Sequence, residues 1–206
     1  MNPFGPRPEW YTPINQEADE LLWSLVKKPK RGNQGTRESW WQGLTELHRR
    51  NASSEILAAR IQKWLETAAH GSDVAAWKAL ARAQETSGLD PVASWRKALE
   101  LDPRDTDARA ELIDAFETQG RSEDALAEYQ ALPGRSAQEV QLGLDMARRL
   151  IVNGERETGM RIAAEIEARA GKNAHTLLNL LDFYNSEGEH KLARQVAERL
   201  VKARPR

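Results

Sequence analysis

The chain has 206 residues, a formal net charge of −1 and 30% charged residues. It is long enough to bury a core and too balanced in charge for bulk attraction to nucleic acid or anionic membranes. Cysteine is absent, which excludes disulfides and thiolate metal sites. No apolar run approaches the roughly 18 residues of a membrane span, and the N-terminus lacks an apolar signal core, so we expect a cytoplasmic protein.

The first 13 residues form a proline-rich segment, with prolines at positions 3, 6, 8 and 13. Because proline fixes φ and lacks an N–H donor, residues 1–13 are predicted to be an extended arm. Trp10 and Tyr11 lie in this arm. Either their rings pack against the first helices, or the arm is a segment that another protein grips.

A helix is predicted from Pro13 to about Lys28, since Thr12 can cap it and proline suits a first helical turn. Helical spacing assigns five apolar residues to its interior face: Ala18, Leu21, Leu22, Leu25 and Val26.

A basic segment, residues 27–37, follows this helix. Pro29, Gly32 and Gly35 predict a break in helical structure, and the five basic residues have no acid among them. Such a segment could contact phosphate, but it lacks the Gly-Lys-Ser/Thr ending of a phosphate loop and no strand precedes it. A solvated loop is the preferred interpretation, and nucleic-acid binding is the alternative.

Two further helices are predicted at 37–50 and 54–69, with Asn51 in a left-handed conformation between them. Trp40 and Trp41 are consecutive and therefore about 100° apart on the helix, so they cannot share one buried seam. Trp40 is assigned to the face of Leu44 and Leu47. Trp41 joins Trp10 and Tyr11 as a candidate aromatic surface for a partner.

Residues 76–103 predict two amphipathic helices joined at Gly88. Asp90-Pro91 is a suitable start for the second helix, and Asp102-Pro103 ends it because the residue before proline avoids the α region. Turn glycines then recur at 88, 120, 154 and 188, which are 32, 34 and 34 residues apart. A period near 34 made of two helices is typical of one repeat class.

Residues 74–206 resemble tetratricopeptide (TPR) repeats, and residues 36–71 resemble a degenerate repeat. The identities are Trp77-x2-Leu80-Ala81, Gly88, Ala98 and a closing Leu-Asp-Pro at 101–103. Later repeats keep a Ser136–Glu139 capping box and place Gly159 where the family usually has alanine.

The resemblance implies an all-α fold, a right-handed α-solenoid of antiparallel helix hairpins. We expect an arm at 1–13, an aromatic-rich helical cap at 14–72 and about four repeats at 73–206. All seven tryptophans precede residue 96, so they either pack as a cap or expose an aromatic patch. The last helix carries an apolar face. Either this face is stable without a cover, or a partner or second copy covers it, or the chain is part of a longer protein. The residues of this face are Leu192, Val196, Leu200 and Val201.

The sequence offers no catalytic or metal-binding constellation, so we expect no enzyme activity, cofactor or metal. The four histidines lack paired-ligand spacing, and acidic residues at helical spacing are interspersed with basic ones. The histidines are His48, His70, His175 and His190.

The resemblance implies that the first helix of each hairpin lines a concave groove that holds a partner segment. The residues placed there are Lys78, Arg82, Glu111, Asp114, Leu144, Arg148, Asp182 and Asn185. A clamp for a terminal carboxylate is not expected, because Arg82 stands where such TPRs have Asn, and Asp107 and Glu111 stand where they have Asn and Lys. The mixed charges either bind a polar segment of matching pattern or pair with each other.

The predicted function is a protein–protein interaction scaffold or adaptor that binds another protein or peptide segment. Homo-oligomerisation through the last helix is a further option, and nucleic acid is a less favoured partner. The alternatives are a nucleic-acid-binding module that uses the basic segment, or a docking module of a larger enzyme.

Overall fold

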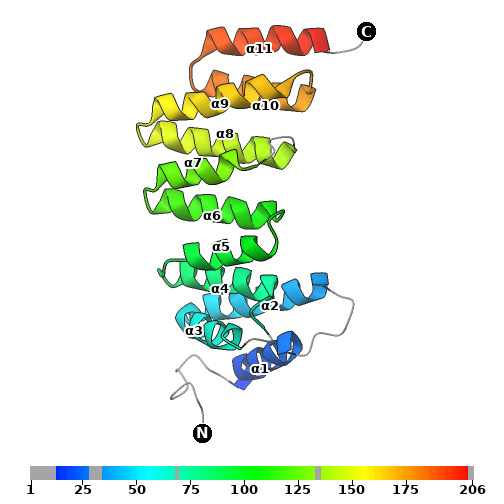
Figure 1. Cartoon of the computed structure of the whole chain (residues 1–206), viewed down its shortest axis with the longest axis vertical. Helices are drawn as coiled ribbons and strands as arrows, with labels where there is room; N and C mark the ends of the chain where they lie inside the picture. The colour runs from blue at the N-terminus through cyan, green and yellow to red at the C-terminus, as the bar shows by residue number, and fades with distance from the viewer. Residues whose placement is uncertain (1–12, 28–33, 68–69, 133–135, 204–206) are drawn as a thin grey trace. The chain divides into compact units, whose positions relative to one another are not determined.

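The structure is a computed structural model that describes residues 13–27, 34–67, 70–132 and 136–203. All regular secondary structure in these ranges is helical (Figure 1), which confirms the predicted all-α class. The helices are α1 (Pro13–Lys27), α2 (Gln34–Arg50), α3 (Ser54–Leu65), α4 (Val74–Thr86), α5 (Val92–Leu101), α6 (Thr106–Thr118), α7 (Ser122–Gln130), α8 (Ala137–Val152), α9 (Arg156–Ala170), α10 (Ala174–Ser186) and α11 (His190–Ala203).

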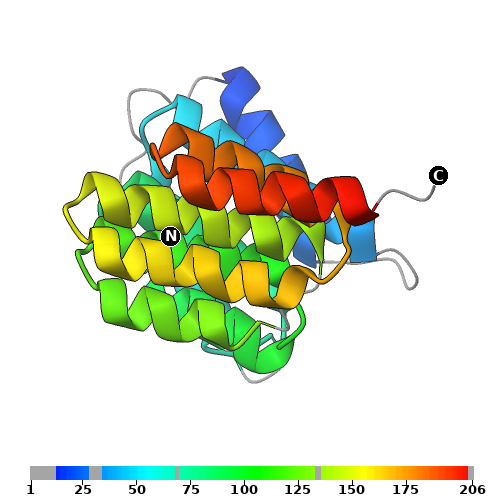
Figure 2. The same cartoon turned by 90° about the horizontal axis from the view of Figure 1, so that it is seen from above.

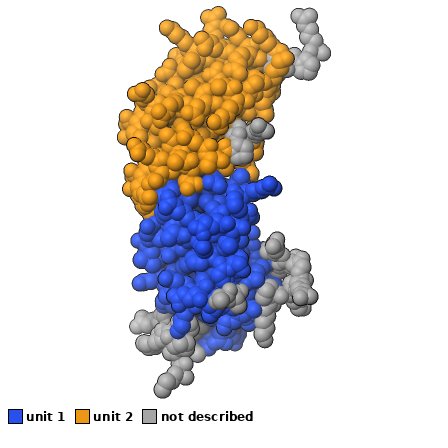
Figure 3. Space-filling model, viewed as in Figure 1, with its two compact units in different colours: residues 1–118 blue, residues 119–206 orange. Residues whose placement is uncertain are grey.

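The helices belong to two compact units, residues 1–118 and 119–206, which Figure 3 colours separately. In unit 1, α1 packs on α2, α3 on α4, and α4 on α5. In unit 2, α8 lies beside α9 and α10 beside α11, as both Figures 1 and 2 show. Consecutive helices therefore pair as hairpins within each unit.

The core of unit 1 runs from α1 to α4 without interruption. Trp23, Trp41, Leu57 and Leu80 are all buried members of one apolar cluster. The boundary expected between residues 72 and 73 lies inside this unit, because α2 and α3 bury their apolar faces against α4.

Helix α1 begins where proline and threonine predict, but it packs through a different face. Trp23 and Val26 are buried, whereas Leu21 is 61% exposed, so the interior assignment of Leu21 is wrong. The spacing is ambiguous because apolar residues lie on both sides of this helix. Indole burial decides the outcome, since the ring of Trp23 removes more apolar surface from water than a leucine does.

The break after α1 is shorter than predicted. Residues 28–33 lie outside the described residues, but α2 already begins at Gln34, so the predicted interruption at Gly35 is wrong. A helical glycine costs only about 1 kcal/mol relative to alanine, which the packing of α2 overrides. The helix predicted at 54–69 is shorter than expected, because α3 ends at Leu65.

The left-handed residue between α2 and α3 is Ala52, not Asn51. Ala52 has φ of 52°, and it is the one non-glycine residue with positive φ in the described ranges. Asn51 instead donates from its Nδ2 to the carbonyl oxygen of Leu47 at 2.7 Å. This bond satisfies a C-terminal carbonyl of α2, and the sharp turn passes to the next residue.

The predicted turn glycines are confirmed by backbone geometry. Gly88, Gly154 and Gly188 have φ of 75°, 92° and 75°. In each turn the residue after the glycine donates its N–H to the carbonyl five residues earlier, at 2.8 Å. This is the closure that a left-handed glycine permits at a helix C-terminus. The capping box at Ser136 and Glu139 is also present.

Gly159 is required by close backbone packing within unit 2. A Cβ atom there would lie 2.6 Å from the carbonyl oxygen of Ala147 and 2.8 Å from Cγ1 of Ile151. Glycine at this position therefore allows α9 to approach α8 more closely than alanine would.

Candidate functional site

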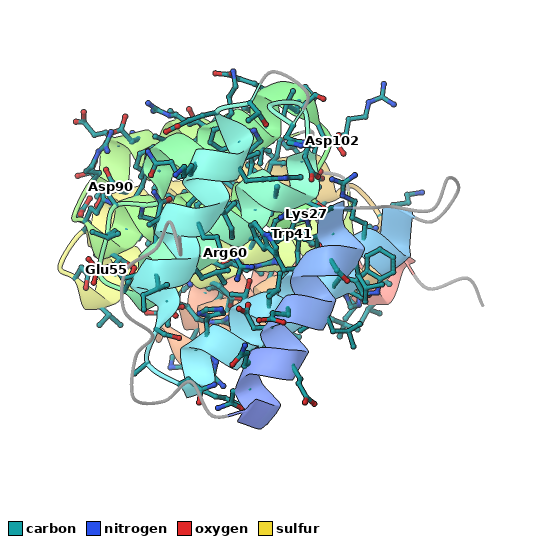
Figure 4. All side chains as sticks on the ribbon, turned by 90° about the horizontal axis from the view of Figure 1, so that it is seen from below. Lys27, Trp41, Glu55, Arg60, Asp90 and Asp102 are labelled. Carbon is teal, nitrogen blue, oxygen red and sulfur yellow. The ribbon has the colours of Figure 1, made fainter. Side chains whose placement is uncertain are left out.

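The aromatic surface proposed from sequence is not supported at Trp41. Trp41 is only 1% exposed, and its ring centroid lies 5.7 Å from that of Trp23 and 5.4 Å from that of Trp64. Figure 4 shows it among the helices of unit 1. Assigning Trp41 to a partner surface was wrong, because α1 and α3 supply aromatic partners that cover it. Trp10 and Tyr11 lie outside the described residues.

A buried polar cluster joins α1, α2 and α3. Nη1 of Arg60 donates to both carboxylate oxygens of Asp19, at 2.9 and 2.8 Å, and Nε2 of His48 lies 3.2 Å from Oδ1. On its other side, Nδ1 of His48 lies 2.9 Å from Oγ of Ser53. Burial opposes ionisation of Asp19, but the bond to His48 and the charge of Arg60 outweigh it and hold its pKa below the usual value.

This cluster contains serine, histidine and aspartate in contact, but its side chains are enclosed. Asp19, His48 and Ser53 are all buried. Oγ of Ser53 also lies within hydrogen-bonding distance of the carbonyl of His48, at 3.2 Å. Because a substrate cannot reach a buried hydroxyl, the arrangement serves to hold three helices together.

Lys78, which the TPR resemblance places in the groove, is buried and engaged inside unit 1. Its Nζ lies 2.7 Å from Oε1 of Glu38 and 2.8 Å from Oδ2 of Asp105. Burial opposes its charge, but the bonds to Asp105 and Glu38 outweigh burial and raise its pKa. Assigning Lys78 as a partner-binding residue was wrong, because two carboxylates distant in sequence already hold its ammonium group.

The remaining charges on α4 and α6 are close to one another. Nη2 of Arg82 lies 4.0 Å from Oε1 of Glu111, and its guanidinium carbon lies 5.6 Å from the ring centroid of Trp95. Glu85 accepts a 2.7 Å bond from the indole of Trp95. Burial raises the pKa of Glu85, and the negative charges of Glu111 and Asp114 add to the rise. Mutual interaction of these charges is therefore favoured over a free polar groove in unit 1.

In unit 2, Leu144 is a core residue with 1% exposure, so its assignment to the partner surface was wrong. Its neighbour on α8, Arg148, does reach the surface. Nη1 of Arg148 donates to Oδ1 of Asp145 at 3.1 Å, and Nη2 donates to Oδ2 of Asp182 on α10 at 3.3 Å. A single guanidinium thus bridges two carboxylates on adjacent first helices.

Helix α10 presents an exposed row of residues beside this bridge, which we call the α10 stripe. Its members are separated by three or four positions, which places them on one helical face. Leu178 is 46% exposed, and the side chain of Asp182 is 82% exposed. The members of the α10 stripe are His175, Leu178, Asp182 and Asn185.

The helix turns of unit 2 form a ladder that the sequence analysis missed. Oγ of Ser122 donates to Oε1 of Glu155 at 2.8 Å, and Nη2 of Arg156 donates to Oε1 of Glu189 at 2.7 Å. In each pair, the donor lies two residues after one turn glycine, and the acceptor lies directly after the following turn glycine. The separation of 33 residues in both pairs would have revealed the ladder, had polar residues been compared across the repeat period.

The structure describes residue 27 and residues 34–37 of the basic segment. Lys27, at its start, is exposed and lies with its Nζ 5.6 Å from the ring centroid of Trp23. Arg37, at its end, pairs with Asp73 and so contributes to packing within unit 1. The nucleic-acid hypothesis for residues 27–37 stays a prediction, because the other basic residues of the segment lie in 28–33, outside the described residues.

None of the helices in the described ranges combines the length and apolar character that a membrane crossing requires. In the same part of the chain, no three histidine, aspartate or glutamate side chains gather where a metal ion could bind.

No protein-family model and no curated protein matches the chain. Among solved structures, the C-terminal part of a TPR repeat-containing protein from Cytophaga hutchinsonii has a TM-score of 0.52 at 13% identity, over 92% of this chain and 74% of that chain. MamA has a TM-score of 0.47 at 13% identity, over 78% and 94% of the two chains. TPR-like repeats of a putative kinesin light chain from Podosopora anserina have 0.47 at 16%, over 92% and 94%. The likeness to the Cytophaga structure confirms a TPR-like helical repeat fold, and at this identity it carries the fold alone.

Proposed function

We propose that this chain is a protein–protein interaction module that binds a segment of a partner protein on one surface of unit 2. This surface is formed by α8 and α10, the first helices of the two hairpins of unit 2, and we call it the first-helix face. The proposal rests above all on the α10 stripe. In it, an exposed leucine, an exposed carboxylate and an exposed amide lie on one helix beside the Arg148 bridge. A TPR-like fold suits such a role because stacked hairpins present extended surfaces.

The choice of unit 2 follows from how the candidate residues are occupied. In unit 1, Lys78 is buried between two carboxylates, and Arg82 lies against Trp95 and near Glu111. Displacing either side chain would break existing contacts before a partner could bind. Leu178 is 46% exposed, and Asn185 makes no side-chain hydrogen bond with a described residue, so neither has a polar contact that a partner would have to break.

Photo-crosslinking in the native host tests this proposal. A photoreactive phenylalanine analogue replaces Asn185 in one variant and Leu89 in the control. Leu89 is 47% exposed and lies at a turn of unit 1, so it is no part of the α10 stripe. We expect discrete protein adducts from position 185 and none from position 89. Adducts of equal yield at both positions, or none at 185, would refute the assignment of the surface.

A further inference from the structure

The first-helix face of unit 2 carries more negative than positive charge around Arg148. Asp145 and Asp182 share this one guanidinium, through bonds of 3.1 and 3.3 Å. Only Oδ2 of Asp182 has a bonded partner within the described residues, and its side chain is 82% exposed. A cationic group from a partner could therefore approach Oδ1 without displacing Arg148.

An apolar contact lies one helical turn away. Leu178 precedes Asp182 by four residues, so the two side chains share a face and are about 6 Å apart along the helix axis. In an extended peptide, alternate side chains point the same way and are about 6.6 Å apart. Residues i and i+2 of an extended segment therefore match the spacing of these two side chains.

Asn185 favours an extended partner over a helical one. Its amide side chain is exposed and makes no hydrogen bond with a described residue. An extended backbone has unpaired N–H and C=O groups that an amide can bond, whereas the backbone groups of a helix are already paired.

We infer that the α10 stripe binds an extended segment in which an aliphatic side chain is followed two residues later by lysine or arginine. The aliphatic residue packs on Leu178, the cation pairs with Asp182, and Asn185 bonds the peptide backbone. This inference rests on the proposed function and adds the chemistry of the partner to it. Because the carboxylate is exposed, salt weakens the preference for the cation.

Three fluorescein-labelled peptides test the inference by fluorescence anisotropy on the full chain. The first has the sequence Gly-Ser-Gly-Leu-Ser-Lys-Gly-Ser-Gly, and the second has glutamate in place of lysine. The third is Gly-Ser-Gly-Leu-Lys-Ser-Gly-Ser-Gly, in which the lysine directly follows the leucine and points to the opposite side. We expect the first peptide to bind about fivefold more tightly than the other two, which is the scale of a favourable exposed charge pair.

Matched variants identify the residues responsible. Asp182→Asn should abolish the preference for lysine over glutamate, and Asp182→Lys should reverse it. The control is Asp124→Asn on α7. Asp124 is an exposed aspartate that, like Asp182, pairs with an arginine, in this case Arg121 of the same turn. Leu178→Ser should weaken all three peptides, and Leu89→Ser should weaken none.

Equal binding of the lysine and glutamate peptides, or a preference that survives Asp182→Asn, would overturn the inference. Absence of peptide binding together with crosslinking at position 185 would also overturn it, and would leave the proposed function standing. Absence of both would remove the proposed function as well.

Discussion

Nζ of Lys78 donates a 2.8 Å hydrogen bond to Oδ2 of Asp105, whose other oxygen accepts the backbone N–H of Ala108 at 2.9 Å. One carboxylate thus caps the start of α6 and anchors it to α4. Arg37 stands in the same relation to Asp73, which accepts the N–H of Ala76 at the start of α4. A basic residue in one first helix therefore holds the aspartate that caps the next.

Replacing Lys78 with methionine should lower the free energy of unfolding by about 1–3 kcal/mol, because it leaves Asp105 and Glu38 without their shared cation. Urea denaturation followed by circular dichroism gives the value. Lys97→Met is the control, since Lys97 pairs with Glu100 on an exposed surface, and its effect should stay below about 0.5 kcal/mol. Equal losses in the two variants would contradict a specific role for Lys78.

Asp19 makes the stability of unit 1 sensitive to acid. Its folded pKa lies below the ordinary value of 3.8, so the ionised form stabilises the folded state above pH 3.8, and this contribution is lost as pH falls through the folded pKa. At pH 7, Asp19→Asn should cost about 2–4 kcal/mol because Arg60 is left partly buried without its carboxylate. Below pH 3.8 the stabilities of the two proteins should converge, as measured by urea denaturation at each pH. A constant difference between them at all pH values would exclude titration of Asp19 as the cause.

Replacing different tryptophans of unit 1 with alanine should lower the free energy of unfolding by different amounts. Trp41 is fully enclosed, so Trp41→Ala should lower the free energy of unfolding by about 3–5 kcal/mol. Trp77 is partly buried and donates from Nε1 to the carbonyl of Gly71 at 2.9 Å, so Trp77→Ala should cost less, about 2–3 kcal/mol. Trp77→Phe separates the hydrogen bond from the packing and should cost about 1 kcal/mol. If Trp77→Ala is the more damaging change, the burial order described above is wrong.

Two helical glycines should respond in opposite directions to alanine. Gly159→Ala should destabilise by about 1–3 kcal/mol, since its Cβ would meet the carbonyl oxygen of Ala147 at 2.6 Å. Gly43→Ala meets only the side chain of Leu22, at 3.4 Å, and should stabilise by about 0.5–1 kcal/mol through higher helix propensity. Thermal unfolding by circular dichroism distinguishes the two signs. Stabilisation by both substitutions would show that the α8–α9 packing can relax around an added methyl group.

The repeat architecture was predictable because its signals are local. A glycine that needs positive φ, such as Gly88 or Gly188, is chosen by backbone sterics at that residue alone. The capping box at Ser136 is equally local, because both of its bonds lie within four residues. Such positions predict the same local backbone conformation whatever tertiary contacts the rest of the chain makes.

The errors lie where a distant partner decides. Helical spacing assigns Trp40 to the inner face with Leu44 and Leu47, but the indoles of Trp23 and Trp64 enclose Trp41 instead. Lys78 occupies a position that the TPR resemblance assigns to the groove, yet Glu38 lies 40 residues before it and neutralises it there. Three of the eight groove candidates illustrate the point: Lys78 and Leu144 are buried, and Arg148 is only partly exposed and bridges two carboxylates.

The confinement of the tryptophans to one part of the chain has an optical consequence. All seven precede residue 96 and therefore belong to unit 1, whereas unit 2 has only Tyr129 and Tyr184 as phenolic chromophores. Emission excited at the red edge of indole absorption reports on unit 1 alone, while the amide signal reports on every helix. Tryptophan fluorescence is therefore an intrinsic probe of unit 1. The difference between the melting temperatures from fluorescence and from the amide signal measures whether the two units unfold together.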